Sequence, residues 1–348
     1  MCLNITILTL FFFSGTSSPT GKFFALGAAV ASHEDTSAWA SIFRYIKSLN
    51  NAPKTHLADG ATAITKAIDE VFGLDTCNRI MCYPHVYRNV SPQLKCVSTF
   101  NKDVGKQILH DIEFLQWSVL NEESFKQVYD LLELKYLGKY DAPLNEALKK
   151  FFTYMRSVWI ESKQNGWFEA ANPWKVSNNQ GVEGKNKDIK QSHTFRRRLD
   201  IGELFSVLLN MVKEWSEEDM KLLESPRTDA LHGEIDSLRL KTDGYQWYKT
   251  NRNKSDRIIR INPGEKYSVN ETVTNFWAVA SSSDKSSSQS LKEKAKERIN
   301  NRKMPKSTTF DEFVVMRTSC WIIEEVNGEF FCDCPIGMKV NAYYMQLL

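Results

Sequence analysis

The chain has 348 residues, of which 42 % are hydrophobic and 25 % charged, and its formal net charge is only +3. This composition is typical of a soluble globular protein and excludes wholesale disorder and collagen-like repeats. No run approaches the ~18 apolar residues of a membrane-spanning helix, so a multi-span membrane protein is also excluded. Seven cysteines are too few for a disulfide scaffold, which favours a reducing compartment, the cytosol or nucleus. The length suits one large domain or two ordinary ones.

Two apolar runs open the chain, Leu3–Phe13 and Lys22–Ala31, joined by the turn-rich segment Thr16–Gly21. The first run resembles the apolar part of a signal peptide. However, no basic residue precedes it, and it is rich in β-branched and aromatic residues, which favour strands. We expect a β-hairpin, with the signal peptide as the alternative.

An alternation of strands and helices follows over the first hundred residues. Ser37 is placed to cap a helix that ends before Pro53, and a short strand, Thr55–Ala58, precedes a second helix from Ala61 to Phe72. Arg79–Cys82 is strand-like again. This order predicts an α/β sheet with helices on its faces.

From Lys102 to about Ser162 the pattern becomes entirely helical, with apolar residues recurring at helical spacing. A further amphipathic helix is predicted over Ile201–Trp215. We interpret these apolar stripes as the core of a helical bundle.

A basic segment lies near the C-terminus. Lys285–Lys306 holds eight basic and two acidic residues, a net +6, which leaves −3 for the rest of the chain. Its low hydrophobicity predicts a flexible or partly helical linker. Such a linker can follow nucleic-acid phosphates, or it can be a solvated tether without a partner.

A small β segment is predicted after the linker. Phe313–Met316 and Trp321–Glu325 are strand-like, and Asn327-Gly328 is a strong hairpin signal. Phe330–Cys334 is the expected partner strand.

Asp59 follows a short strand at a glycine turn before a helix. Ligands of open α/β sheets bind at this edge, so the Asp59 carboxylate is a candidate ligand for a metal or phosphate. Considered alone, the same position is an ordinary helix N-cap.

Glu183 lies in the first turn of a predicted helix, where the helix dipole favours a carboxylate without any catalytic role. The basic run Arg196–Arg198 (Arg196, Arg197 and Arg198) follows. Basic residues beside a carboxylate suit a metal-dependent phosphodiester site. A solvated basic turn is the simpler interpretation.

Two cysteine motifs have metal-ligand spacing. Cys82 and His85 form a single C-x-x-H pair, for which a buried cysteine and a histidine at a helix start are the alternative. Cys332 and Cys334 lie two residues apart on a predicted strand, where their thiolates would point to the same side and could bind one Zn²⁺. No Cys or His follows Cys334, so this motif is half of a zinc site.

These pieces resemble, in order and spacing, the core of the Mutator-like element (MULE) transposase family. The matching segments cover roughly residues 5–215; they are GKFFALGAAVASHEDTSAWASIFRYIKSL, HLADGATAITKAIDEVFG, MCYPHVYRNV and SNNQGVEGKNKDIKQSHTFRRR. The tail WIIEEVNGEFFCDCPIGMK resembles the first half of a SWIM-type zinc finger, which commonly follows such transposases.

The resemblance implies an RNase H-like fold interrupted by a helical insertion, with three carboxylates that hold Mg²⁺ or Mn²⁺ for cleavage and transfer of DNA ends. Asp59 matches the second acidic position and Glu183 the third. Cys82 and His85 match the family's C-x-x-H pair. The implied domains are 1–100, the N-terminal part of the core; 101–170, the helical insertion; 171–280, the rest of the core with following helices; 281–308, the linker; and 309–348, the partial SWIM finger.

The chain departs from the family at both ends. The family's first Asp lies on a strand before Leu3–Phe13, but no Asp precedes Asp35 here, and the SWIM motif lacks its later Cys-x-His. Two-metal chemistry needs carboxylates that bridge both ions. We therefore expect an inactive chain, shortened by decay of the element or by a wrong gene model, and a doubtful Zn²⁺ site.

The expected protein is nuclear and associates with the terminal inverted repeats of transposon DNA. Self-association stays open, and no membrane partner is expected. The alternative is a non-catalytic, transposase-derived factor that binds DNA or a protein.

Overall fold

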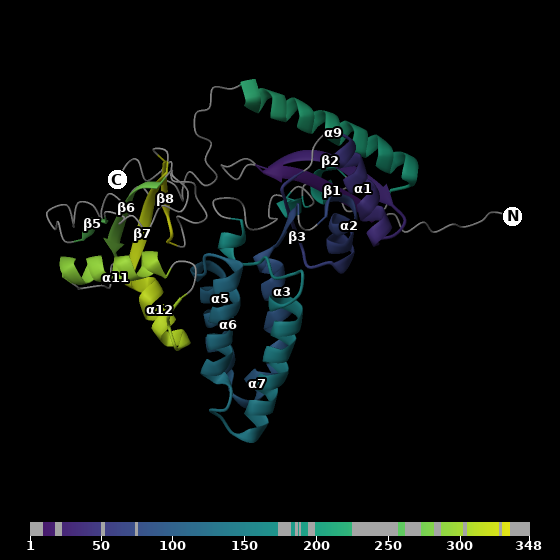
Figure 1. The fold of residues 1–348 in the computed structure, drawn as a ribbon. Coiled ribbons are helices and arrows are strands. Elements are labelled where there is room, and N and C mark those ends of the chain that lie inside the picture. The colour runs from purple at the N-terminus through teal and green to yellow at the C-terminus, as the bar shows by residue number, and fades with distance from the viewer. Residues whose placement is uncertain are drawn as a thin grey trace. The chain divides into compact units, whose positions relative to one another are not determined.

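The computed structural model describes residues 10–17, 23–49, 53–73, 76–172, 182–184, 187, 189–193, 199–224, 257–261, 273–281, 287–301, 305–326 and 329–334. The described chain is a mixed α/β protein, mostly helical, with small sheets (Figure 1). Contacts divide it into two compact units, one of residues 1–82 with 178–234, the other of residues 83–177 with 235–348. In the part of the chain so described, no helix is both long enough and apolar enough to span a membrane.

The first unit begins with the expected hairpin. Strands β1 (Leu10–Ser17) and β2 (Phe23–Ala31) pair antiparallel from Leu10 opposite Ala31, with a register shift between Ser14 and Gly15. The expected hairpin is confirmed, although β1 extends to Ser17, within the segment expected as the connector, and residues 3–9 of the first run lie outside the described residues.

A parallel pair of strands follows the hairpin in this unit. Strands β3 (Thr55–Ala58) and β4 (Asn78–Met81) are joined by helix α2 (Thr62–Phe72), as a parallel connection requires a crossover. Helix α1 (Thr36–Ser48) packs on α2 through a buried apolar cluster: Ala40, Phe43, Ile64, Ala67, Ile68, Val71 and Cys77. The cap of α1 is Asp35, which accepts a hydrogen bond from the Ala38 N–H at 2.9 Å, so the expectation of Ser37 was wrong.

The first unit resumes at residue 178, after residues 83–177 of the second unit. The π-helical turn η3 (Ile189–His193) is followed by helix α9 (Ile201–Glu224). Leu208, Met211 and Trp215 of α9 form a buried cluster with Ile189, against which Val30 of β2 packs. Leu208 and Trp215 confirm part of the inward stripe predicted for Ile201–Trp215, whereas Phe205, Leu209 and Val212, also expected inward, are exposed.

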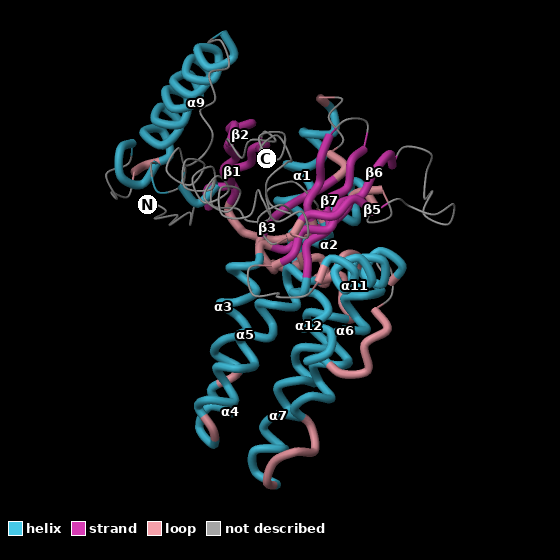
Figure 2. Tube along the Cα trace, turned by 90° about the vertical axis from the view of Figure 1, so that its left-hand side faces the viewer, coloured by secondary structure: helices cyan, strands magenta, loops and turns pink. Residues whose placement is uncertain are grey.

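The intervening segment is helical and belongs to the second unit. It comprises α3 (Tyr83–Gln93), α4 (Lys95–Phe100), α5 (Lys102–Ser118), α6 (Glu122–Tyr136), α7 (Ala142–Met155), the π-helical η1 (Arg156–Ile160) and the 3₁₀ turn η2 (Glu169–Ala171). Side chains of Asn101, Asn121 and Asp141 cap the starts of α5, α6 and α7. Figure 2 shows α5, α6 and α7 as a long helical stack.

The second unit also contains a four-stranded antiparallel sheet in the order β5-β6-β7-β8. Its strands are β5 (Ile258–Ile261), β6 (Val273–Ala280), β7 (Cys320–Val326) and β8 (Glu329–Cys332). Figure 2 shows β5, β6 and β7 side by side. The predicted C-terminal hairpin is confirmed by the pairing of Val326 with Glu329; its turn, 327–328, lies outside the described residues.

The segment 281–308, expected to be a flexible or partly helical linker, is helical in its central part, and this helix packs on the sheet. Ser288–Asn300 forms helix α11, whose Leu291, Ala295 and Ile299 pack against the sheet in one core. This apolar spacing lets the helix bury one face despite its many charges.

Phe313–Met316 is corrected, from strand to helix. It lies in α12 (Phe310–Ser319), which begins with a capping box in which Thr309 and Glu312 bond each other's backbone N–H groups. Phe310 and Phe313 both contact Phe114 of α5, with ring centroids 6.1 Å apart in each pair. The C-terminal segment is therefore anchored on the helical insertion.

Candidate functional site

Asp59 lies directly after β3, in the turn that leads to α2. Its Oδ1 accepts a hydrogen bond from the Ala61 N–H at 3.0 Å. Ala61, not Asp59, is the N-cap of α2. The carboxylate thus stabilises the turn, and the simple N-cap interpretation of Asp59 was wrong.

Arg79 of β4 occupies the same end of the parallel strand pair. Its side chain is buried, and its Nη1 donates to the carbonyl oxygens of Ile80 at 2.6 Å and Ala58 at 3.4 Å. Its Nη2 donates to the carbonyl oxygen of Asp59, and its Nε lies 3.4 Å from Thr65 Oγ1. One guanidinium therefore joins the end of β3 to β4 and α2.

Burial changes the ionisation of two side chains in this region. It lowers the pKa of Arg79 to about 10, while the charge of Asp59 acts in the opposite direction. Burial, followed by the charge of Arg79, lowers the pKa of His56 to about 4. His56 is therefore neutral at physiological pH, and Arg79 is the local positive charge.

Glu183 lies in the same compact unit as Asp59. It is helical and half-buried, and its neighbour Val182 packs on the cluster of Ile189, Leu208 and Met211. Asp59 and Glu183 therefore belong to the same unit, although about a hundred residues of the other unit separate them in sequence.

The residues around Asp59 do not fit a divalent-metal site. Among the described residues, no three His, Cys, Asp or Glu side chains gather where they could hold a metal ion. The buried guanidinium of Arg79 instead places a fixed positive charge close enough to interact with Asp59, which disfavours a second cation there.

Cys82 and His85 are placed by different elements. Cys82 is buried just after β4, where its N–H donates to the Ala58 carbonyl oxygen at 3.0 Å and extends the parallel ladder. His85 lies in the first turn of α3, half-buried. In the described chain neither residue belongs to a metal-binding group of three.

Cys332 ends β8, and Cys334 lies beyond the strand, which corrects the expectation of two thiols on one strand face. The Cys334 N–H donates to Cys332 Sγ at 3.4 Å. A hydrogen bond with the Cys334 thiol, together with burial and the charge of Asp333, raises the pKa of Cys332. Among the described residues no third metal-ligating side chain gathers at this pair, so they do not form a complete zinc site.

No family model, curated protein or solved structure matches the chain.

The predicted basic contacts to nucleic acid are only partly described. Arg196, Arg197 and Arg198 lie outside the described residues. On α11, Lys292 and Lys296 are exposed, but so are Glu293 and Glu297, and Arg298 is buried. The surface of α11 is therefore less basic than its sequence suggests.

Sequence reasoning missed three buried charged residues, Arg298, Arg317 and Asp333. Arg298 Nη2 and Arg317 Nη1 both donate to Asp333 Oδ2, at 2.5 and 3.0 Å. The signal that could have found Arg298 was its spacing on the apolar face of α11, three residues after Ala295 and seven after Leu291.

Proposed function

We propose that the chain is derived from a Mutator-like element transposase and that it acts in the nucleus as a DNA-associated protein that does not cut DNA. The fold implied by this proposal is RNase H-like, with a helical insertion. Asp59 and Glu183 then hold the second and third acidic positions of the family.

The observation that carries the proposal is the interrupted first unit. Residues 1–82 and 178–234 form one unit, although the helices of residues 83–177 separate them in sequence. An α/β core divided by a helical insertion is the architecture that the family resemblance implies. It also places the segments of Asp59 and Glu183 in the same unit.

The proposed lack of cleavage depends on two features. The carboxylate of Asp35 is engaged as the N-cap of α1, where it accepts a hydrogen bond from the Ala38 N–H. At Asp59, the buried Arg79 supplies a positive charge beside the turn. Both features oppose the bridging carboxylates that two-metal cleavage requires.

Cleavage is tested with supercoiled plasmid incubated with the purified chain in Mg²⁺ or Mn²⁺. We expect no nicking above the rate of plasmid alone. Metal-dependent nicking that is lost in Glu183→Gln would overturn the proposed inactivity and support an active transposase core.

Association with DNA is tested by fluorescence anisotropy of a short duplex across a salt series. The double variant Lys292→Gln, Lys296→Gln removes two exposed charges of α11. It should reduce the salt slope by about 1 for each of these lysines that neutralises a phosphate. Lys126→Gln, Lys149→Gln removes two exposed lysines from α6 and α7 as the matched control, with no change expected.

The outcome of this titration separates two functions. No binding to the duplex at low salt would overturn DNA association and leave the alternative, a transposase-derived factor with a protein partner. Salt-dependent binding without nicking is the result that the proposal requires.

A further inference from the structure

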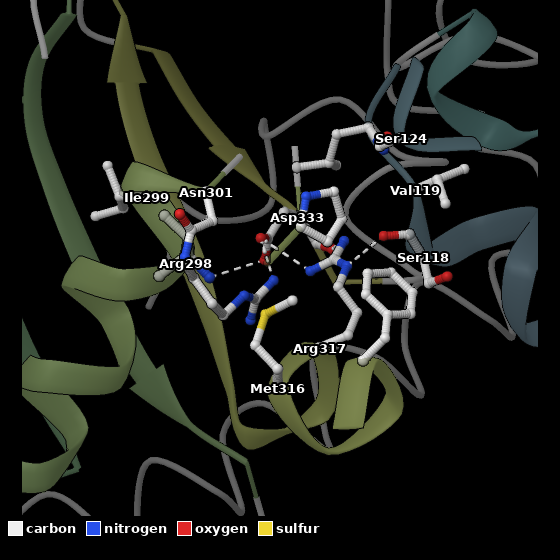
Figure 3. A pocket seen from close by; sticks show the side chains of 13 residues that line it. Ser118, Val119, Ser124, Arg298, Ile299, Asn301, Met316, Arg317 and Asp333 are labelled. Atoms are coloured by element: carbon white, nitrogen blue, oxygen red, sulfur yellow. Dashed lines mark hydrogen bonds and ion pairs between the residues drawn. The ribbon is translucent and has the colours of Figure 1, made fainter. Parts of the chain in front are cut away.

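A small cavity lies inside the second unit, where α11, α12 and the end of α5 meet the last strands of the sheet. Its volume is about 30 Å³, room for about two water molecules. Figure 3 shows Arg298 and Arg317 pointing into it from α11 and α12, toward Asp333. Half-buried Leu120, Asn301 and Met316 also line it, so it has a partly open side.

The charges that line the cavity do not balance. Arg298 and Arg317 are 6 % and 2 % exposed, and Asp333 is the single carboxylate among the lining residues. The lining therefore carries a formal charge of +1 in a buried place, where an uncompensated charge is costly. An anion in the cavity would remove this excess.

Hydrogen-bond donors are also left over in the cavity. Arg317 donates to Ser118 O at 2.5 Å, Asp333 Oδ2 at 3.0 Å and Asp333 O at 2.7 Å. Arg298 donates to only one oxygen within the described chain, Asp333 Oδ2, and makes a long contact of 3.9 Å with Cys320 Sγ. A guanidinium has five N–H donors, so most of those on Arg298 lack an oxygen partner there.

The hydroxyl of Ser118, which is unpaired in the described chain, also favours a bound anion. Ser118 is 1 % exposed, lines the cavity, and its Oγ has no hydrogen-bond partner among the described residues. Buried polar groups are normally paired, and an exception indicates a missing water or ligand. In the part of the chain that the structure describes, the Ser118 hydroxyl is therefore an unused hydrogen-bonding group in the wall of the cavity.

From this geometry we propose that the cavity binds one free phosphate-type oxyanion. Charge-assisted hydrogen bonds are about twice as strong as neutral ones, so an anion gains more from these donors than water does. The enclosed volume takes about two of the anion's oxygens, so the other oxygens would face the partly open side, and a base or sugar does not fit inside. The burial of both guanidiniums keeps them away from a duplex backbone, which favours the free anion over DNA phosphate.

Isothermal titration calorimetry with inorganic phosphate, in chloride buffers of equal ionic strength, tests the site. We expect saturable binding of one phosphate per chain. Ser118→Ala should weaken it about tenfold, the factor expected for one hydrogen bond to a charged group. Ser157→Ala, which changes an exposed serine of η1, should bind phosphate as the wild type does.

The stability of Ser118→Ala without phosphate distinguishes a loss of binding from a loss of folding. Because the Ser118 hydroxyl is unpaired, Ser118→Ala should be as stable as the wild type or slightly more stable. Arg298→Lys keeps the charge but loses the planar fork, and it should also weaken phosphate binding.

Three results would overturn the proposal: no saturable heat, equal phosphate affinity in the wild type and Ser118→Ala, or a thermal shift that rises without saturation in every variant. The last is the general salt effect of phosphate. Failure of a short duplex to displace phosphate supports the free anion. Displacement by the duplex would retain the cavity as an oxyanion site but assign it to DNA phosphate.

Discussion

Arg317 donates two hydrogen bonds to Asp333, one from Nη1 to the carboxylate at 3.0 Å and one from Nη2 to the backbone carbonyl at 2.7 Å. Arg298 donates to the same carboxylate from α11, and the Ile322 N–H donates to its other oxygen at 2.8 Å. One buried carboxylate thus joins α11, α12 and β7 at the end of β8.

Asp333→Asn should therefore destabilise the protein strongly. The amide keeps the side-chain shape but leaves two buried guanidiniums without a counter-charge, and breaking a buried ion pair costs roughly 3–5 kcal/mol. Urea unfolding monitored by tryptophan fluorescence measures the loss. Asp103→Asn is the control, because that side chain is 94 % exposed and its pairing with Lys106 contributes under about 1 kcal/mol. Equal effects of the two substitutions would contradict the assignment.

A second prediction concerns His56 and acid pH. Burial and Arg79 lower its pKa to about 4, against about 6.5 in the unfolded chain. Between these values the unfolded state binds the proton and the folded state does not, so stability falls as pH drops from 6.5 to 4. The loss from this group is about 3 kcal/mol at most.

His56→Phe should remove that part of the pH dependence. The ring lies 5.0 Å from Phe43 and 5.1 Å from Phe72 between centroids, so phenylalanine suits the site. The measurement is the thermal midpoint across this pH range. His33→Gln alters an exposed histidine and should retain the wild-type profile, whereas an unchanged slope in His56→Phe would show that His56 is not the responsible group.

Two glycines of the first unit should respond to alanine with opposite signs. Gly73 ends α2 at φ +80°, where a Cβ is strained, so Gly73→Ala should cost about 1–2 kcal/mol. Gly184 is helical with no atom within 4 Å of an added Cβ, and Gly184→Ala should stabilise by up to about 1 kcal/mol. Changes of the same sign in thermal unfolding would contradict the backbone assignments.

The sequence predicted the hairpin, the β3-α2-β4 order and the helical insertion because each depends on local periodicity. It failed at Phe313–Met316, where the β-branched valines suggested a strand. The capping box of Thr309 and Glu312 and the packing of Phe313 on Phe114 decide for the helix instead. The capping signal was present in the sequence; the partner ring, two hundred residues away, was not.

At the candidate site, too, the features set by local sequence were predicted and those set by contacts between distant segments were not. The position of Asp59 after a strand was predicted, but the guanidinium beside it was not, because Arg79 reaches the Asp59 backbone only through the parallel register that pairs His56 with Arg79. Likewise Arg298, counted as a linker charge, is buried because Asp333 lies opposite it in the fold. Pairing of buried charges across distant segments leaves no periodic signal.

The last prediction concerns the thiols. Because its pKa is raised, Cys332 is protonated at neutral pH, and the thiolate is both the nucleophile and the zinc ligand. Iodoacetamide should therefore modify exposed Cys96 quickly and Cys332 slowly in the folded chain, as followed by peptide mass spectrometry over time. Because no group of three metal-ligating side chains gathers among the described residues, the purified protein should also hold no stoichiometric zinc that depends on Cys332. An alkylation rate of Cys332 equal to that of Cys96 would contradict the burial of this thiol. Chelator-resistant zinc that is lost in Cys332→Ser would show that Cys332 is a zinc ligand.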